Sequence, residues 1–191
     1  MSIANAGARL PDIEFNDDSL NRRNVITDHL IAWDIPAYPN YLLTKRAIYT
    51  NAVHGWDALF VEGNIDWRMV SWGGVPIDAR AYGETDTPCS CIPAVDNPQV
   101  SSSDDATWLK DNDIVFGLEL KGEYRAYPRR IMEVREMVND SLGGRQLGIP
   151  YCTLCGAAQA YFTEIMPDGV ERPILRTSGL LIRSNKAMYD M

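Results

Sequence analysis

With 191 residues, 46% of them hydrophobic, the chain is long enough to bury the core of one domain, or of one domain with an appendage. A net charge of -8 and a pI near 4.7 exclude the basic surface that nucleic acid needs, and they disfavour docking on anionic lipid. No apolar run reaches the roughly 18 to 20 residues of a membrane helix, so we expect no membrane insertion. The start of the chain lacks the basic and apolar segments of a secretory signal, which predicts a cytoplasmic protein.

The first third of the chain carries helical periodicity. Apolar residues recur at helical spacing over residues 19–33, with Asp18 or Ser19 as the N-cap, and again over residues 41–53. A shorter helix is predicted over residues 56–61. These patterns predict a helical N-terminal portion.

Residues 63–99 are interrupted repeatedly by glycine and proline, which leaves little room for long elements. We interpret this stretch as the boundary between a helical N-terminal portion, residues 1–70, and a β-rich domain, residues 71–191. After this stretch, a serine-rich segment predicts the cap of one short helix that carries Trp108.

The pattern then becomes mostly that of antiparallel strands. Residues 114–120 and 124–127 flank Lys121-Gly122 and predict a hairpin, and Pro128 marks the start of a short helix. The remaining predicted elements follow in order: a turn at 139–144, a strand at 145–151, a hairpin of 157–165 with 170–177, and a loop with a last strand over 178–191. The predicted fold class is α+β, with a mostly antiparallel sheet and one or two short helices.

The densest reactive chemistry lies at Cys152-Thr153-Leu154-Cys155, directly after the strand predicted over residues 145–151. Two thiols at this spacing can close into one disulfide or bind one soft metal ion as thiolates. In a thiol reaction, Cys152 is the nucleophile and Cys155 is the resolving partner. A small molecule or a protein thiol would then be the reaction partner.

Three interpretations of the cysteines remain open. The first is thiol redox chemistry or catalysis at Cys152 and Cys155. In the second, Cys89 and Cys91 join Cys152 and Cys155 to form a four-thiolate zinc site, although Cys-x-Cys is a less usual half-site. In the third, all four are small buried thiols without chemistry.

Two further features bear on function. Asp140 precedes the cysteine strand and can orient a site residue or act as a general base, or it can hydrogen-bond its own turn. Three of the five tryptophans fall within residues 33–67, which leaves open a partner-binding surface in the N-terminal portion.

Five motifs occur in an order typical of one family. The chain resembles the bacterial and archaeal family known as domain of unknown function 3179 over about residues 92–191. The motifs are Ile92-Pro93-Ala94-Val95-Asp96-Asn97-Pro98, Arg125-Ala126-Tyr127-Pro128, Val138-Asn139-Asp140-Ser141-Leu142-Gly143-Gly144, Tyr151-Cys152-Thr153-Leu154-Cys155-Gly156, and Ser178-Gly179-Leu180-Leu181 followed by Met188-Tyr189-Asp190.

The chain departs from the family pattern at informative positions. Thr153 replaces the proline of the family's Cys-Pro-Leu-Cys, and Arg135-Glu136 replaces His-Glu. This resemblance implies that Arg135 keeps a positive charge near the thiolate without proton transfer, so Arg135, Glu136 and Asp140 are the predicted neighbours that tune the cysteines. Arg183-Ser184-Asn185-Lys186 stands where Asn-Ser-Asp is usual. Relatives are often exported and usually continue beyond the final motif, which implies a C-terminally shortened domain.

Overall fold

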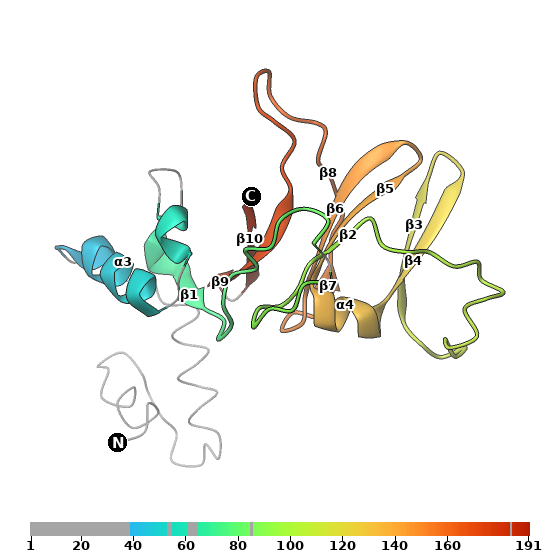
Figure 1. The fold of residues 1–191 in the computed structure, drawn as a ribbon, viewed down its shortest axis with the longest axis horizontal. Helices are drawn as coiled ribbons and strands as arrows, with labels where there is room; N and C mark the ends of the chain where they lie inside the picture. Colours follow the sequence, from blue (N-terminus) through green and yellow to red (C-terminus); the bar gives the residue numbers. More distant parts are fainter. Residues whose placement is uncertain (1–38, 53–54, 61–64, 85, 184) are drawn as a thin grey trace, which may run out of the picture. The chain divides into compact units, whose positions relative to one another are not determined.

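The computed structural model describes residues 39–52, 55–60, 65–84, 86–183 and 185–191 (Figure 1). The chain divides into two compact units, residues 1–41 and 42–191, and almost all of the described residues belong to the second. The helix predicted over residues 19–33 lies outside the described residues. The predicted domain boundary near residue 70 stays a prediction.

The described residues form two α-helices, two single-turn helices and three antiparallel or mostly antiparallel sheets. The helices are α3 (Tyr41–Ala52), η1 (Trp56–Leu59), η2 (Trp67–Met69) and α4 (Arg129–Arg135). The strands are β1 (Val70–Trp72), β2 (Val95–Asp96), β3 (Val115–Leu120), β4 (Glu123–Pro128), β5 (Met137–Leu142), β6 (Arg145–Cys152), β7 (Ala157–Ala158), β8 (Tyr161–Phe162), β9 (Leu175–Ile182) and β10 (Asn185–Asp190).

The sheets bring together strands that are distant in sequence. One sheet has the order β1-β9-β10, and β3 pairs with β4 alone. In the five-stranded sheet, β2, β5, β6 and β7 lie in that order and β8 also pairs with β6. Only the β2–β5 pair is parallel among the pairs formed by the described residues. The predicted α+β class with mostly antiparallel pairing is therefore confirmed.

Several predicted elements agree with the structure. Helix α3, the β3–β4 hairpin and the strand that ends at Cys152 form within two residues of their predicted bounds. Helix α4 begins directly after Pro128, as predicted, and ends at Arg135. The hairpin forms because Lys121 and Gly122 both adopt positive φ, at 52° and 80°, which a tight two-residue turn between twisted strands requires.

Three local predictions are wrong. The predicted turn at 139–144 contains most of β5, whose Asn139 and Asp140 side chains bond to side chains from other elements. Asp140 Oδ1 also accepts from the neighbouring Ser141 amide at 2.7 Å. The predicted hairpin of 157–165 with 170–177 does not form, because β7 and β8 pair with β6 and β9 pairs with β1 and β10. The segment around Trp108 forms turns instead of a helix.

Two hydrophobic clusters stabilise the fold. One lies between the β5–β6 hairpin, β4 and α4, and it includes Tyr127, Met132, Val138, Leu142 and Ile149. The other is aromatic and includes Trp56, Phe60 and Trp67, with the rings of Phe60 and Trp67 stacked at 3.9 Å between centroids. Because Trp56 and Trp67 are core residues, they do not form the predicted partner surface, and Trp33 lies outside the described residues.

A buried polar network joins β9 to β2 and β5. Arg176 is 1% exposed, and its guanidinium donates to both carboxylate oxygens of Asp96, at 2.8 and 2.6 Å. Asn139 also donates to Asp96, at 2.8 Å. Burial raises the pKa of Asp96, but the hydrogen bonds from Arg176, the Gly83 amide and Asn139 outweigh it and lower the pKa below its ordinary value. This network therefore holds a charged carboxylate inside the fold.

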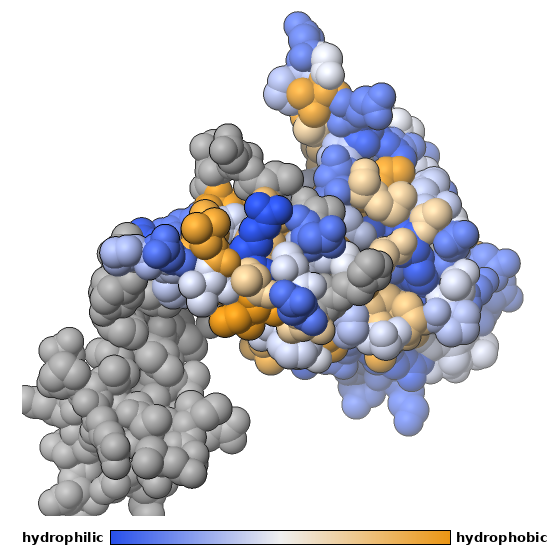
Figure 2. All heavy atoms as spheres, turned by 60° about the vertical axis from the view of Figure 1, so that its left-hand side comes forward, coloured by the Kyte–Doolittle hydropathy of each residue, from blue (hydrophilic) through white to orange (hydrophobic). Residues whose placement is uncertain are grey.

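On the face shown in Figure 2, hydrophobic residues lie in small separate groups among hydrophilic ones. Within the described part of the chain, no helix has both the length and the apolar composition needed to cross a bilayer.

Candidate functional site

The two central cysteines lie in the tight connection between β6 and β7. Cys152 is the last residue of β6 and pairs with Ala157 of β7, so the four intervening residues form a turn. Gly156 closes this turn with a φ of 64°, a left-handed conformation that glycine adopts without a Cβ clash. The turn brings the Sγ atoms of Cys152 and Cys155 to 2.7 Å from each other. The predicted pairing of these two thiols is thus present in the fold.

The two thiols have different surroundings. Cys152 is buried, whereas Cys155 is exposed and lies 3.5 Å from Asn185 Oδ1. The hydrogen bond to Cys152, followed by burial and the charge of Cys152, raises the pKa of Cys155 above its ordinary value. Cys155 therefore loses its proton less readily than an ordinary cysteine thiol.

Glu136 connects this turn to two other elements. It follows α4 directly, in the left-handed region at a φ of 51°, a conformation that costs a non-glycine residue about 1–2 kcal/mol. Its backbone carbonyl accepts from the Tyr151 amide at 2.9 Å. Its carboxylate accepts a hydrogen bond from Thr153 Oγ1 and forms an ion pair with Lys186 of β10. The unusual backbone conformation thus directs a buried carboxylate toward the cysteine turn.

The Lys186 side chain is as buried as that of its partner, with 8% exposed against 10% for Glu136. Burial lowers the pKa of Lys186 to about 7, whereas the Glu136 carboxylate beside it favours the protonated form. The amine donates hydrogen bonds in both protonation states. Lys186 therefore supplies N–H groups to this site across the neutral pH range.

Cys152, Glu136 and Lys186 line one cavity of about 230 Å³. Its polar wall consists of Glu136, Cys152, Thr153, Thr177 and Lys186. The remaining wall is glycine and aliphatic: Gly73, Val75, Ile92, Leu154, Gly179, Leu180 and Leu181. A cavity of this size takes a small molecule or the end of a larger one, and places it against the buried thiol of the pair.

Two predicted neighbours lie apart from this cavity. Arg135 is half-buried at the end of α4, and no described hydrogen bond or ion pair joins it to the cysteines. Asp140 binds Arg125 and Tyr127 of β4 instead, at 2.7 and 2.8 Å. Burial, followed by the hydrogen bond to Asp140, raises the pKa of Tyr127. Of the three predicted neighbours, the structure brings only Glu136 to the cysteine turn.

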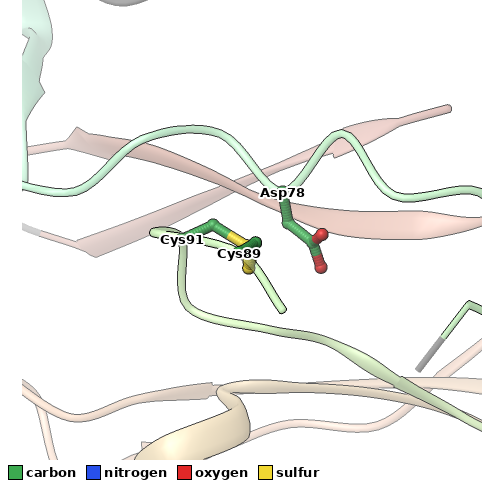
Figure 3. A group of neighbouring side chains, drawn as sticks. All are labelled: Asp78, Cys89 and Cys91. Atoms are coloured by element: carbon green, nitrogen blue, oxygen red, sulfur yellow. A yellow bond between two sulfur atoms is a disulfide. The ribbon is translucent and has the colours of Figure 1, made fainter. Parts of the chain in front are cut away.

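The second cysteine pair forms its own group. Cys89 and Cys91 are joined by a disulfide, and their sulfur atoms lie near a carboxylate oxygen of Asp78 (Figure 3). Both oxygens of Asp78 are already occupied, by the Arg80 guanidinium and the Ala94 amide. Among the described residues, no group of potential ligand atoms contains cysteines from both pairs. The structure therefore does not bring the four predicted zinc ligands together.

The sequence interpretation did not include three polar residues of the cavity wall, Thr153, Thr177 and Lys186. The available signal for Thr153 was its replacement of the family's proline. Lys186 lies in the segment where the chain departs from the Asn-Ser-Asp family pattern, and that departure was the available signal. Thr177 gave no signal, because its hydroxyl meets the cavity only after β9 packs beside the segment that ends at Ile92, whose carbonyl accepts from Thr177 Oγ1 at 2.6 Å.

The comparison with protein families agrees with the resemblance that the order of the motifs indicated. A family model described as "Protein of unknown function (DUF3179)" matches residues 89–191, just over half of the chain. A search of curated proteins found no match, and a search of solved structures found none either. The matched segment contains both cysteine pairs, Glu136 and Lys186. The chain therefore belongs to the DUF3179 family of proteins of unknown function.

Proposed function

We propose that this protein carries out thiol–disulfide exchange at Cys152 and Cys155. The observation that supports the proposal is the 2.7 Å separation of two cysteine sulfurs that are not joined in a disulfide, one of which belongs to a residue that lines a cavity. Two thiols at this spacing can convert reversibly into one intramolecular disulfide, because the turn already holds the sulfurs close together.

The exchange takes place in two balanced steps. The Cys152 thiolate attacks one sulfur of a disulfide substrate, forms a mixed disulfide and releases the other half of the substrate as a thiolate, which takes up a proton from solvent. Cys155 then loses its proton to solvent and attacks the Cys152 sulfur. This step forms the Cys152–Cys155 disulfide and releases the second half as a thiol. The substrate gains two electrons, and the protein dithiol loses them.

The surroundings of each thiol support this order. Cys152 lines the cavity, so a bound substrate meets its sulfur first. Cys155 has a raised pKa and does not line the cavity, which suits a resolving thiol that is deprotonated only in the second step. We assign no step to Arg135 or Asp140, because neither contacts the cysteines in the described structure.

The test uses chains in which Cys89 and Cys91 are both replaced by serine, so that only one cysteine pair reacts. The reduced Cys89→Ser/Cys91→Ser protein is mixed with excess bis(2-hydroxyethyl) disulfide, and the released 2-mercaptoethanol is counted per chain. We expect two equivalents from this protein, one equivalent and a stable mixed disulfide after the further change Cys155→Ser, and no rapid release after Cys152→Ser.

Two outcomes would overturn the assignment. One is release from the Cys152→Ser chain as fast as from its parent, which would make Cys155 the attacking thiol. The other is about one zinc ion per chain in anaerobically purified wild-type protein, lost when either cysteine pair is replaced. That result would support the four-thiolate metal site instead.

A further inference from the structure

The Lys186 amine has unused hydrogen-bonding capacity inside the cavity. Its side chain is 92% buried, as the 8% exposed fraction implies, and it lines the cavity beside Cys152. The amine carries two or three N–H donors, depending on its protonation. Apart from the Glu136 carboxylate, Lys186 Nζ has no acceptor among the described residues. A buried donor without an acceptor destabilises the fold, so a ligand that offers an acceptor here is favoured.

The charge of the site restricts what that acceptor can be. Lys186 and Glu136 together are neutral when both are ionised, and they carry a negative charge when only Glu136 is ionised. A carboxylate ligand would add a buried negative charge in either state. An ammonium ligand would leave a buried positive charge on the ionised pair, and in either state it offers Lys186 no acceptor, because an ammonium nitrogen has no lone pair. Both buried charges cost more than burial of a neutral polar group. The acceptor that fits best is therefore uncharged.

The rest of the wall indicates the shape of the ligand. Val75, Ile92, Leu180 and Leu181 offer aliphatic surface, and a volume of about 230 Å³ suits a group of only a few heavy atoms. Thr177 Oγ1 uses its proton on the Ile92 carbonyl at 2.6 Å, so its lone pairs remain available to accept a hydrogen bond. A primary carboxamide on a short aliphatic chain supplies an oxygen for Lys186 and an N–H for Thr177.

We propose that the cavity selects small neutral disulfides that carry a carboxamide, with the amide oxygen bound by Lys186 Nζ and one sulfur presented to Cys152. This inference rests on the proposed exchange reaction and names its substrate class. Glu136 acts as a positioning residue, because its carboxylate holds the Lys186 amine at the cavity wall.

The experiment compares three probes of nearly equal size: 3,3′-dithiodipropionamide, 3,3′-dithiodipropionic acid and cystamine. The rate of mixed-disulfide formation is followed by intact mass on the Cys89→Ser/Cys91→Ser/Cys155→Ser chain. Each rate is divided by the rate of the same probe with free dithiothreitol at the same pH, which removes intrinsic reactivity. We expect the amide to react about tenfold faster than both charged probes, since tenfold corresponds to about 1.4 kcal/mol, which one net hydrogen bond can supply.

The control variant carries Glu136→Gln and Lys186→Met in addition, which removes both charges together and leaves no unpaired buried carboxylate. We expect the preference for the amide to fall to about twofold or less in this variant. Equal normalised rates for the three probes, or a preference that persists in the control variant, would overturn the inference.

A second measurement separates binding from exchange. 3-(Methylthio)propanamide has the same amide arm but no disulfide, and we expect it to raise the melting temperature of the wild-type protein and not that of the Glu136→Gln/Lys186→Met variant. If this amide binds while none of the three disulfides reacts, the exchange reaction is wrong and the amide site stands. If the amide does not bind, the inference is wrong whatever the disulfides do.

Discussion

Two of the buried sets of charged side chains in the described part of the chain differ in how completely their hydrogen bonds are satisfied. In the network between β9, β2 and β5, all five N–H groups of Arg176 have an acceptor on Asp96 or on a backbone carbonyl. At the cavity, Glu136 is the only acceptor that the described residues offer to the Lys186 amine. The basic residues of the two sets, Arg176 and Lys186, lie on adjacent strands of one sheet, β9 and β10.

This difference indicates that the two sets of charged side chains have different roles. A charge whose hydrogen bonds are all made inside the fold has nothing left to offer a ligand, so its role is to fix the positions of the strands. A buried charged group whose N–H donors lack acceptors destabilises the fold unless a ligand or a water molecule supplies an acceptor. The Arg176 network therefore supports the scaffold, and the Lys186–Glu136 pair belongs to the site.

The largest expected effect is on the satisfied network. Arg176→Met leaves Asp96 buried without its charged partner, and we expect the free energy of unfolding to fall by about 3–5 kcal/mol. Urea unfolding followed by circular dichroism measures the loss. The matched control is Arg129→Met, which breaks an exposed i,i+4 pair with Glu133 and is expected to change the free energy of unfolding only slightly. A similar loss in both variants would remove the distinction between the network and an ordinary surface pair.

A smaller effect is expected at the cavity. Lys186→Met leaves the Glu136 carboxylate with Thr153 as its remaining described side-chain partner, and we expect a loss of about 1–3 kcal/mol. The paired change Glu136→Gln/Lys186→Met removes both charges, and its stability should lie within about 1 kcal/mol of the wild type. The same urea titration compares the two variants. If the paired change is as destabilising as Arg176→Met, the cavity pair is a structural element like the network.

The smallest effect is the response of the network to acid. The pKa of Asp96 in the folded state lies below its ordinary value, so the folded state binds fewer protons than the unfolded state around that pH. The stabilisation by Asp96 is complete above the unfolded pKa of about 3.9 and is lost as the pH falls through the lower folded pKa. We expect the urea midpoint to fall between pH 5 and pH 3. Asp96→Asn, already less stable, should show a shallower fall, and an equally steep one would contradict this origin.

The sequence predicted correctly those elements that depend on residues close together in the chain, and it failed for those that depend on distant residues. The β3–β4 hairpin, α3 and α4 were predictable because turn residues and apolar spacing act over a few positions. Strand β5 was not, because Asn139 and Asp140 resemble turn residues until their side-chain partners, which lie on other elements, are known. The same applies to β9, which lies between β10, the next strand in the sequence, and β1, a strand far earlier in the chain.

The sequence by itself determined the family, the α+β class and the pairing of Cys152 with Cys155, because motif order, periodicity and a spacing of three residues are local properties of the chain. The tertiary structure decided which charged residues accompany the thiols. In the fold, Lys186 and Glu136 line the cavity, and Asp140 of β5 bonds to a side chain of β4 instead. Cys89 and Cys91 form a separate disulfide. These choices depend on how β10, α4 and β6 pack together, and contacts between residues that are 50 positions apart leave no pattern in a single sequence.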